Sequence, residues 1–495
     1  MFNFDNSYTT LAEDFYQAIM PSSAVAPQLI AFNTRLANEL GIDYDGIDEQ
    51  SLANIFSGKT ILPGSKPISQ AYAGHQFGNF VPSLGDGRAI LLGEIITPKG
   101  LRVDVQLKGA GKTPFSRGGD GRSALGPVIR EYIVSEAMHA LNIPTTRALA
   151  AVTSGEQVYR DNSYQNNLVP GGILTRIASS HIRVGTFEYF ASRQEYANVK
   201  QLADYAIKRH YPELLGQENI YLAFFRAVAK RKLSLVAKWM SVGFIHGVMN
   251  TDNNSISGET LDFGPCAFMD QFSEQKVFSS IDRNSRYAYS NQANIALWNI
   301  SSLANCLVPI MGIEPDDVSA LFDQEFEILS DYSKTVWAQA MGNKLGIFSA
   351  TQEDLGLINN WLHYLENENL DFTNSFHDLA AVLHQNSAQT DDKINTKLKT
   401  SKEFEQFLSA WKNRLQQQSQ DIEASESLMQ QHNPLFIPRN HQVEKAIVQA
   451  MEGNYKHFHR LNHVLGTPFT EQEAHQDLKA PPKEDEIVQQ TFCGT

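Results

Sequence analysis

The side chains of this 495-residue chain that are best suited to chemistry lie within residues 246–264, HGVMNTDNNSISGETLDFG. Asn253 follows His246 by seven positions, and a D-F-G triplet begins nine positions later, at Asp262. Amide and carboxylate oxygens are the ligands that Mg²⁺ or Mn²⁺ prefers where it bridges phosphate groups. The two residues therefore predict a divalent-metal site for a nucleotide. Zinc catalysis has no support, because the histidines do not show zinc-ligand spacing.

The same spacing occurs in protein kinases, where the motifs H-R-D-x-x-x-x-N and D-F-G frame the active site. The third residue of that loop is the catalytic Asp, but here it is Val248. An acid stands instead at Asp252, beside Asn253, where it could act as general base toward a hydroxyl. The alternative is that Asp252 only forms a turn in the Asn- and Asp-rich run 250–254. Spacing alone leaves both interpretations open.

Glycine-rich segments upstream could hold phosphates. The turn Gly85-Asp86-Gly87-Arg88 precedes a predicted strand, and glycine lets the backbone approach phosphate oxygens there. Residues 108–123, KGAGKTPFSRGGDGRS, place five glycines among basic residues ahead of a predicted helix, which suits anion binding. This segment is not a Walker A loop, since Gln106 stands where that motif requires its first glycine.

Two arginines, Arg176 and Arg183, flank the segment IASSHIR and could clamp terminal phosphates. The alternative for each is an ordinary surface charge.

The elements that must position these groups follow from periodicity. Residues 89–96 and the alternating run 101–108 predict a β-hairpin that ends at Lys108. A helix is predicted over 123–141 from its apolar stripe. Glu131 and Glu136 lie on or beside this stripe, and a carboxylate there needs a partner. Lys108 is the candidate, as in a kinase N-lobe, and the sequence leaves open which glutamate pairs with it.

The remainder of the chain predicts one α+β domain with two lobes. Residues 200–245 and 300–425 show mainly helical patterns, and no internal repeat or clean linker divides the chain. The net charge of −14 argues against a nucleic-acid binder. Three cysteines, an acidic N-terminus without a leader pattern, and the lack of a long apolar run favour a cytoplasmic protein without membrane spans. Nothing in the sequence indicates an obligate assembly, so we expect a monomer.

Several long segments resemble the selenoprotein O family. The resemblance covers essentially the whole chain, including the opening FNFDNSYTTL, and rests on AYAGHQFGNFVPSLGDGRA (71–89), QLKGAGKTPFSRGGDGRS (106–123), SEAMHALNIPTTRALA (135–150), VGFIHGVMNTDNNSISGETLDFGP (242–265) and NPLFIPRNH (433–441).

The resemblance implies a protein-kinase-like fold, with a small β-rich N-lobe and a larger helical C-lobe. This fold binds ATP in a flipped orientation and transfers AMP to protein Ser, Thr or Tyr hydroxyls. UMP transfer is left open. Asp252 would be the base, and Asn253 and Asp262 would hold Mg²⁺ or Mn²⁺. The implied nucleotide-contacting residues are Gly85, Gly87, Arg88, Lys108, Asp120, Gly121, Arg176, Arg183 and Asp262.

The expected divisions are an N-terminal extension (1–65), the N-lobe (66–190), the C-lobe (191–470) and a mobile tail (471–495) that carries Cys493. Family members can pair a C-terminal cysteine with one after D-F-G, and the candidate partner here is Cys266.

Two other functions compete with AMP transfer. One is a phosphotransferase, against which the missing acid at Val248 argues. The other is a pseudokinase scaffold, against which the retained metal-site residues argue.

Overall fold

The computed structural model describes residues 1–160, 168–383, 398 and 401–492. Its largest sheet is antiparallel, with the strand order β1-β3-β6-β7-β10-β9-β2 and the short β8 paired to β10. The strands of this sheet are β1 (Tyr16–Ala18), β2 (Gln28–Phe32), β3 (Ile68–Gln70), β6 (Ala89–Ile96), β7 (Arg102–Lys108), β8 (Ser123–Ala124), β9 (Arg147–Tyr159) and β10 (Leu168–Ala178). Two small two-stranded sheets stand apart from it, the hairpin of β4 (Gly74–Gln76) with β5 (Asn79–Val81), and β11 (Phe244–Ile245) with β12 (Ala267–Phe268).

The predicted hairpin is confirmed as β6 and β7, with Ala89 opposite Lys108. Val105 and Leu107 are fully buried, as their alternation predicts. Leu101 is 61% exposed because it lies before the strand, and Val103 is partly buried. Lys108 therefore ends a central strand, where the neighbouring β10 can place side chains beside it.

The helix predicted over 123–141 is α3 (Leu125–Ala140). It begins two residues later than expected, because Ser123 and Ala124 form β8 against Gly171 and Gly172. α3 packs on β9 and β10 and carries both candidate glutamates.

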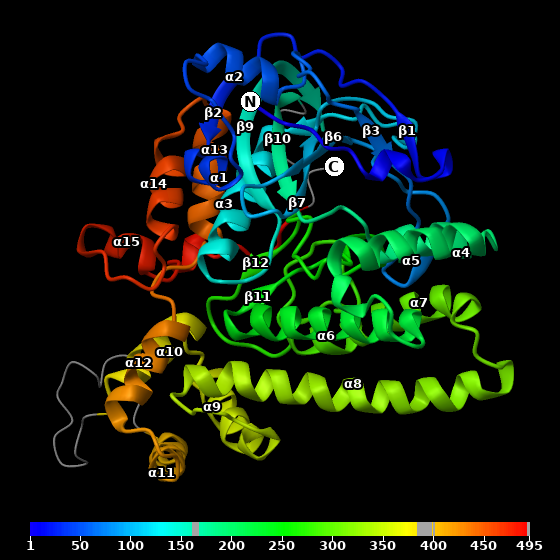
Figure 1. The fold of residues 1–495 in the computed structure, drawn as a ribbon. Coiled ribbons are helices and arrows are strands. Elements are labelled where there is room, and N and C mark those ends of the chain that lie inside the picture. The colour runs from blue at the N-terminus through cyan, green and yellow to red at the C-terminus, as the bar shows by residue number, and fades with distance from the viewer. Residues whose placement is uncertain (161–167, 384–397, 399–400, 493–495) are drawn as a thin grey trace.

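Helices make up most of the remaining chain, as predicted, and Figure 1 shows the long ones beneath the sheet. They are α1 (Thr34–Glu39), α2 (Glu49–Phe56), α4 (Val184–Ala191), α5 (Tyr196–His210), α6 (Ile220–Ser241), α7 (Gln292–Met311), α8 (Pro315–Lys344), α9 (Leu355–Asn367), α10 (Phe372–Ala380), α11 (Lys402–Gln416), α12 (Ile422–His432), α13 (Asn440–Met451), α14 (Lys456–Leu465) and α15 (Gln476–Lys479).

The segment expected as an N-terminal extension contributes to the main sheet. Its strand β1 pairs with β3, and its strand β2 pairs with β9 at the opposite end of the sheet. The C-terminal helices α13 and α14 return to pack against α3, far from the helices that precede them in sequence (Figure 1).

We expected a mobile tail from residue 471, but the structure places residues 471–492 on the body of the protein. Leu478 is buried in an apolar cluster with residues of α3, α13 and α14. Thr491 donates a hydrogen bond to the Pro265 carbonyl at 2.6 Å, directly after the D-F-G triplet. Cys493 lies outside the described residues, and its proposed partner Cys266 is buried.

One helical segment in the described part of the chain, Tyr289–Met311, is long and apolar enough to cross a membrane by composition. Its most apolar window is 56% buried inside the protein. α7, which forms most of it, packs against α4, α5 and α6, so the segment serves as a core helix.

Candidate active site

The loop that carries Asn253 and Asp262 is held between β11 and β12, which pair with each other. His246 opens the loop and is fully buried, with its Nε2 3.0 Å from the Leu261 carbonyl and its ring stacked on Trp239. This contact joins the two ends of the loop. His246 therefore shapes the loop rather than meeting a ligand, and burial lowers the pKa of its imidazole to about 4.

Three cationic side chains donate hydrogen bonds to the carboxylate of Asp262. Its Oδ1 accepts hydrogen bonds from Lys108 Nζ at 2.9 Å and Arg176 Nη2 at 2.7 Å, and its Oδ2 accepts one from Arg183 Nη1 at 2.8 Å. Burial alone would raise the pKa of Asp262, but the three cations hold it well below its usual range. The backbone of Asp262 is left-handed, with φ of +66°, which turns the carboxylate toward these partners. Four predicted residues are thereby brought into one cluster.

Glu131 is the glutamate that pairs with Lys108. Its Oε2 lies 2.7 Å from Lys108 Nζ, and its Oε1 accepts from Arg176 Nε at 2.8 Å. Burial opposes ionisation of Glu131, yet Arg176 and Lys108 lower its pKa below the usual value. The other candidate, Glu136, makes a bidentate pair with Arg147 at 2.8 Å. α3 therefore uses one acid for the cluster and one to hold the start of β9.

Asp252 lies at the edge of this cluster and is 7% exposed. Its Oδ2 accepts from Gln76 Nε2 at 3.3 Å, while its buried Oδ1 has no hydrogen-bond partner in the described protein. Arg183 Nη1 donates to the Asp252 main-chain carbonyl at 2.6 Å, which ties the residue to the Asp262 cluster. Burial raises the pKa of Asp252 to about 6, against the opposing effect of Arg183. An acid with one unpartnered oxygen and a raised pKa suits a general base.

Gly74 of the β4–β5 hairpin closes one side of Asp252. A Cβ at this position would lie 2.7 Å from Asp252 Oδ1, so any larger residue would push into the carboxylate. The hairpin therefore limits the approach to Asp252.

Asn253 fits a metal ligand by its orientation. Its Nδ2 donates to the Val248 carbonyl at 3.0 Å, which leaves Oδ1 as the atom available to a cation. On Asp262, Oδ2 accepts a single side-chain hydrogen bond and keeps a second lone pair. The donor set is thus all oxygen, which suits Mg²⁺ or Mn²⁺.

The turn at Gly85 and Gly87 requires glycine for reasons of space. Gly85 has φ of +61°, and a Cβ there would lie 2.2 Å from the Phe115 ring. A Cβ on Gly87 would lie 2.9 Å from the Phe115 carbonyl oxygen. The turn therefore packs tightly against the glycine-rich segment. Arg88 is half-buried, and its guanidinium has no polar partner among the described residues, so it is available to a ligand.

Asp120 and Gly121 lie outside the Asp262 cluster. Asp120 is paired to Arg160 at 2.8 Å, and it also accepts from the Arg122 amide. Gly121 has φ of +68°, and a Cβ there would lie 2.2 Å from the Gly111 backbone. Both residues shape the glycine-rich segment in this structure, and no contact joins them to Asp252 or Asp262.

Several residues that hold the loop in place were not predicted from the sequence. Glu188 of α4 accepts from the Thr251 hydroxyl and lies 2.6 Å from His75 Nδ1, while the His75 amide donates to Thr251 Oγ1 at 2.6 Å. Gln76 donates a hydrogen bond to Asp252, and Arg183 Cζ lies 4.6 Å from the centroid of the Tyr72 ring. The motifs at 71–89 and 242–265 contain four of these residues, all but Glu188. Their role in supporting the loop follows only from their contacts in the three-dimensional structure.

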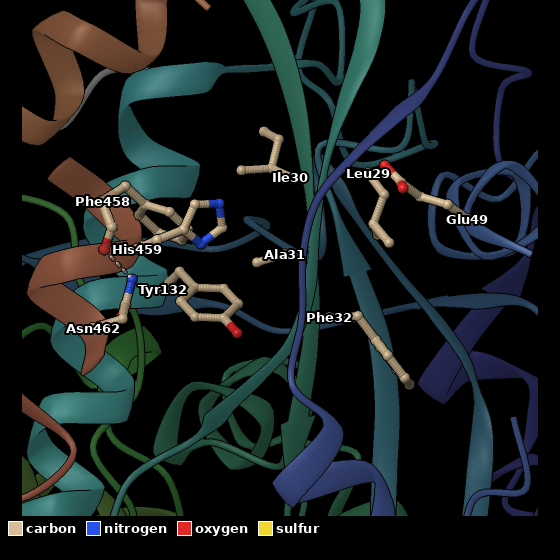
Figure 2. A pocket seen from close by; sticks show the side chains of 9 residues that line it. All are labelled: Leu29, Ile30, Ala31, Phe32, Glu49, Tyr132, Phe458, His459 and Asn462. Atoms are coloured by element: carbon tan, nitrogen blue, oxygen red, sulfur yellow. Dashed lines mark hydrogen bonds between the residues drawn. The ribbon is translucent and has the colours of Figure 1, made fainter. Parts of the chain in front are cut away.

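A cavity of about 340 Å³ beside the edge strand β2 is distinct from this cluster. Figure 2 shows β2 running through it, with Tyr132, His459 and Asn462 on one side and Glu49 on the other. None of the described residues that line it is a lysine or arginine, so it does not suit phosphate groups.

Comparison with known proteins places these residues in a family context. The family model described as "Protein adenylyltransferase SelO" matches residues 1–465. The chain is similar to proteins named "Protein nucleotidyltransferase YdiU". It is 48% identical to that of Rhizobium meliloti (strain 1021) over 495 residues, covering 100% of this chain and 99% of the relative. It is 47% identical to that of Agrobacterium fabrum (strain C58) over 499 residues, covering 100% of both chains. It is 49% identical to that of Rhodopseudomonas palustris (strain BisB18) over 497 residues, covering 100% of this chain and 99% of the relative.

Proposed function

Since the chain belongs to the SelO family of protein adenylyltransferases, we propose that the cluster around Asp262 is the site where it transfers AMP from ATP to protein hydroxyls. The protein is an enzyme of the nucleotidyltransferase type, and ATP is its nucleotide substrate. The assignment of each residue's part in the reaction is our proposal. The observation that carries it is the convergence of Lys108, Arg176 and Arg183 on Asp262, next to an acid with one unpartnered oxygen.

In this proposal the three cations exchange part of their contact with Asp262 for the phosphates of ATP. Lys108 and Arg183 are held by buried partners, so they are oriented before the nucleotide arrives. Arg88 is available beside the Gly85–Gly87 turn and would add a fourth positive group. Asp120 and Gly121 would support this segment, and any contact they make with nucleotide would require it to shift.

The chemical step follows from the position of Asp252. The acceptor hydroxyl loses its proton to the Asp252 carboxylate, and its oxygen bonds to the α-phosphorus. The bond from that phosphorus to the β-phosphate bridging oxygen breaks, and pyrophosphate leaves. Lys108, Arg176 and Arg183 neutralise the charge that grows on the leaving group. This step requires ATP to lie with its α-phosphate, rather than its γ-phosphate, near Asp252.

Asn253 Oδ1 and Asp262 Oδ2 would hold Mg²⁺ or Mn²⁺. Such an ion, when bound, supplies charge compensation for the phosphate oxygens of the nucleotide. We further propose that the sheet with α3 corresponds to the N-lobe of a kinase-like fold and that the helices α5 to α12 correspond to its C-lobe, while α13 and α14 pack on α3. The Lys108–Glu131 pair between strand and helix supports this correspondence.

A phosphotransferase is the second candidate, and the geometry favours it less. Val248 stands at the position of the kinase base, is 8% exposed, and offers only its carbonyl to Asn253. A pseudokinase scaffold is also less favoured, because the base and the metal-binding oxygens lie together.

Mass spectrometry of an acceptor protein incubated with ATP, Mg²⁺ or Mn²⁺ and the enzyme tests this proposal. We expect the mass of an adenylyl group on Ser, Thr or Tyr, and about 10²–10⁴-fold less product from Asp252→Asn. The mass of a phosphoryl group alone would refute AMP transfer. Full activity of the Asp252→Asn variant would refute the assignment of Asp252 as the general base.

A further inference from the structure

A second cavity, of about 380 Å³, lies between α6, α8 and the segment that joins Asn253 to Asp262. Its lining is Pro144, Lys230, Arg231, Ser234, Leu235, Lys238, Ser257, Gly258 and Tyr332. The proposed reaction uses none of these residues.

Positive charge dominates this cavity. Lys230, Arg231 and Lys238 are exposed residues of α6, and none of the described lining residues carries a carboxylate. This concentration of cations is unusual in a chain with a net charge of −14. Like charges around a concave surface focus the positive potential there, which attracts anions.

The two lysines have neutral neighbours. Lys230 Nζ lies 5.7 Å from the Tyr332 ring centroid, and Lys238 Nζ lies 3.4 Å from the Asn142 carbonyl oxygen. Arg231 is more engaged, since it donates to the His210 carbonyl at 2.8 Å and lies 3.9 Å from a Glu213 oxygen. Over the described residues, no carboxylate pairs with either lysine.

Hydroxyl groups stand between these charges. Lys230, Ser234 and Lys238 are spaced by four residues along α6, so they share one face, with the lysine Cα atoms about 12 Å apart. Ser234 Oγ lies 2.9 Å from the Tyr332 hydroxyl, and either can donate to a ligand. Ser257 Oγ donates to Glu259 at 2.9 Å and lies 2.7 Å from Ser255 Oγ, which leaves one lone pair as an acceptor for a ligand.

From this arrangement we propose that the cavity binds a small polyanion of the phosphate class, with pyrophosphate as the simplest member. Ammonium groups bind phosphate as point charges, and hydroxyls can satisfy further oxygens. The separation of the two lysines favours a ligand with more than one phosphate group over a single phosphate. The cavity in Figure 2, which contains Glu49 and no lysine or arginine among its described lining residues, lacks these features.

The cavity is a separate site, but it shares a wall with the catalytic loop. Gly258 has φ of +82°, and a Cβ there would lie 3.0 Å from Arg231 Cβ, so this part of the loop rests on α6. A ligand here would contact the segment between Asn253 and Asp262 without occupying the nucleotide site.

Calorimetric titration of the full chain with sodium pyrophosphate, without divalent metal and at low salt, tests the site. The variant Lys230→Gln/Lys238→Gln removes both lysine charges. The control Lys445→Gln/Lys456→Gln removes two charges from exposed positions of α13 and α14. Pyrophosphate that binds at the nucleotide site is common to all three proteins, so the comparison isolates the cavity, whether or not the proposed function holds.

We expect the cavity variant to bind one equivalent fewer than wild type, or to bind that equivalent at least about tenfold more weakly. The control should match wild type, and the affinity of the lost event should fall as salt increases. AMP transfer by the cavity variant at saturating ATP would show that it is folded. Equal stoichiometry and affinity in the cavity variant and the control would overturn the proposal.

Discussion

Asp252 is buried and Asp262 is partly buried in the same site, but their surroundings drive their ionisation in opposite directions. Three cations keep Asp262 charged, whereas burial outweighs the single nearby Arg183 at Asp252. One carboxylate is thus held permanently negative and the other is poised to accept a proton. The sequence predicted both residues from motif spacing, but their difference depends on neighbours that are distant in the chain.

The pH dependence of AMP transfer should report Asp252. The pKa of its carboxyl is raised to about 6, so the acid is protonated below this pH and cannot accept the hydroxyl proton. We expect kcat to fall as pH drops through about 6 and to level off above about 7. A rate profile in a metal-saturated buffer series measures this, and a flat profile from pH 5 to pH 8 would contradict it.

At the scale of elements, α3 determines where Lys108 and Arg176 point. The sequence could predict this helix and the β6–β7 hairpin, because their apolar residues recur at helical and strand spacing. It could not choose between Glu131 and Glu136, because the choice depends on Arg176 of β10 and Arg147 of β9. Partners from other strands leave no local signal.

Glu131→Gln should damage the site through this helix. Lys108 and the buried Arg176 would each lose one of their two carboxylate partners and keep only Asp262. Losing charged hydrogen bonds of this kind costs about 1.5–3 kcal/mol of stability, and displacement of the two cations should reduce AMP transfer about 10²-fold. Glu136→Gln is the matched control on the same helix, because it frees Arg147 but touches no group at Asp262. Thermal denaturation and transfer assays on both variants compare them. Equal transfer rates in the two would show that α3 does not orient the cations.

For the whole molecule, the two ends of the chain are the parts that sequence predicted least well. Strands β1 and β2 are short and find their partners, β3 and β9, far along the chain. The polar composition of the last residues suggested a loose tail, but isolated apolar side chains dock it. Leu478 is 2% exposed, and Thr491 binds the carbonyl that follows the D-F-G triplet.

Leu478→Ala should destabilise the protein although it lies in this polar tail. Truncating a buried leucine costs about 2–5 kcal/mol, so the thermal midpoint should fall. Ile487→Ala is the control from the same tail, where the side chain is 41% exposed and should matter little. Equal midpoints for the two variants would mean that the tail does not dock in solution.

The central claim is that the site acts on the α-phosphorus of ATP. The most direct measurement incubates the enzyme and a protein acceptor with ATP labelled at either the α- or the γ-phosphate. We predict that label from the α-position enters protein, that γ-label leaves as pyrophosphate, and that Asp252→Asn reduces incorporation to near background. Incorporation of the γ-label alone would contradict the account.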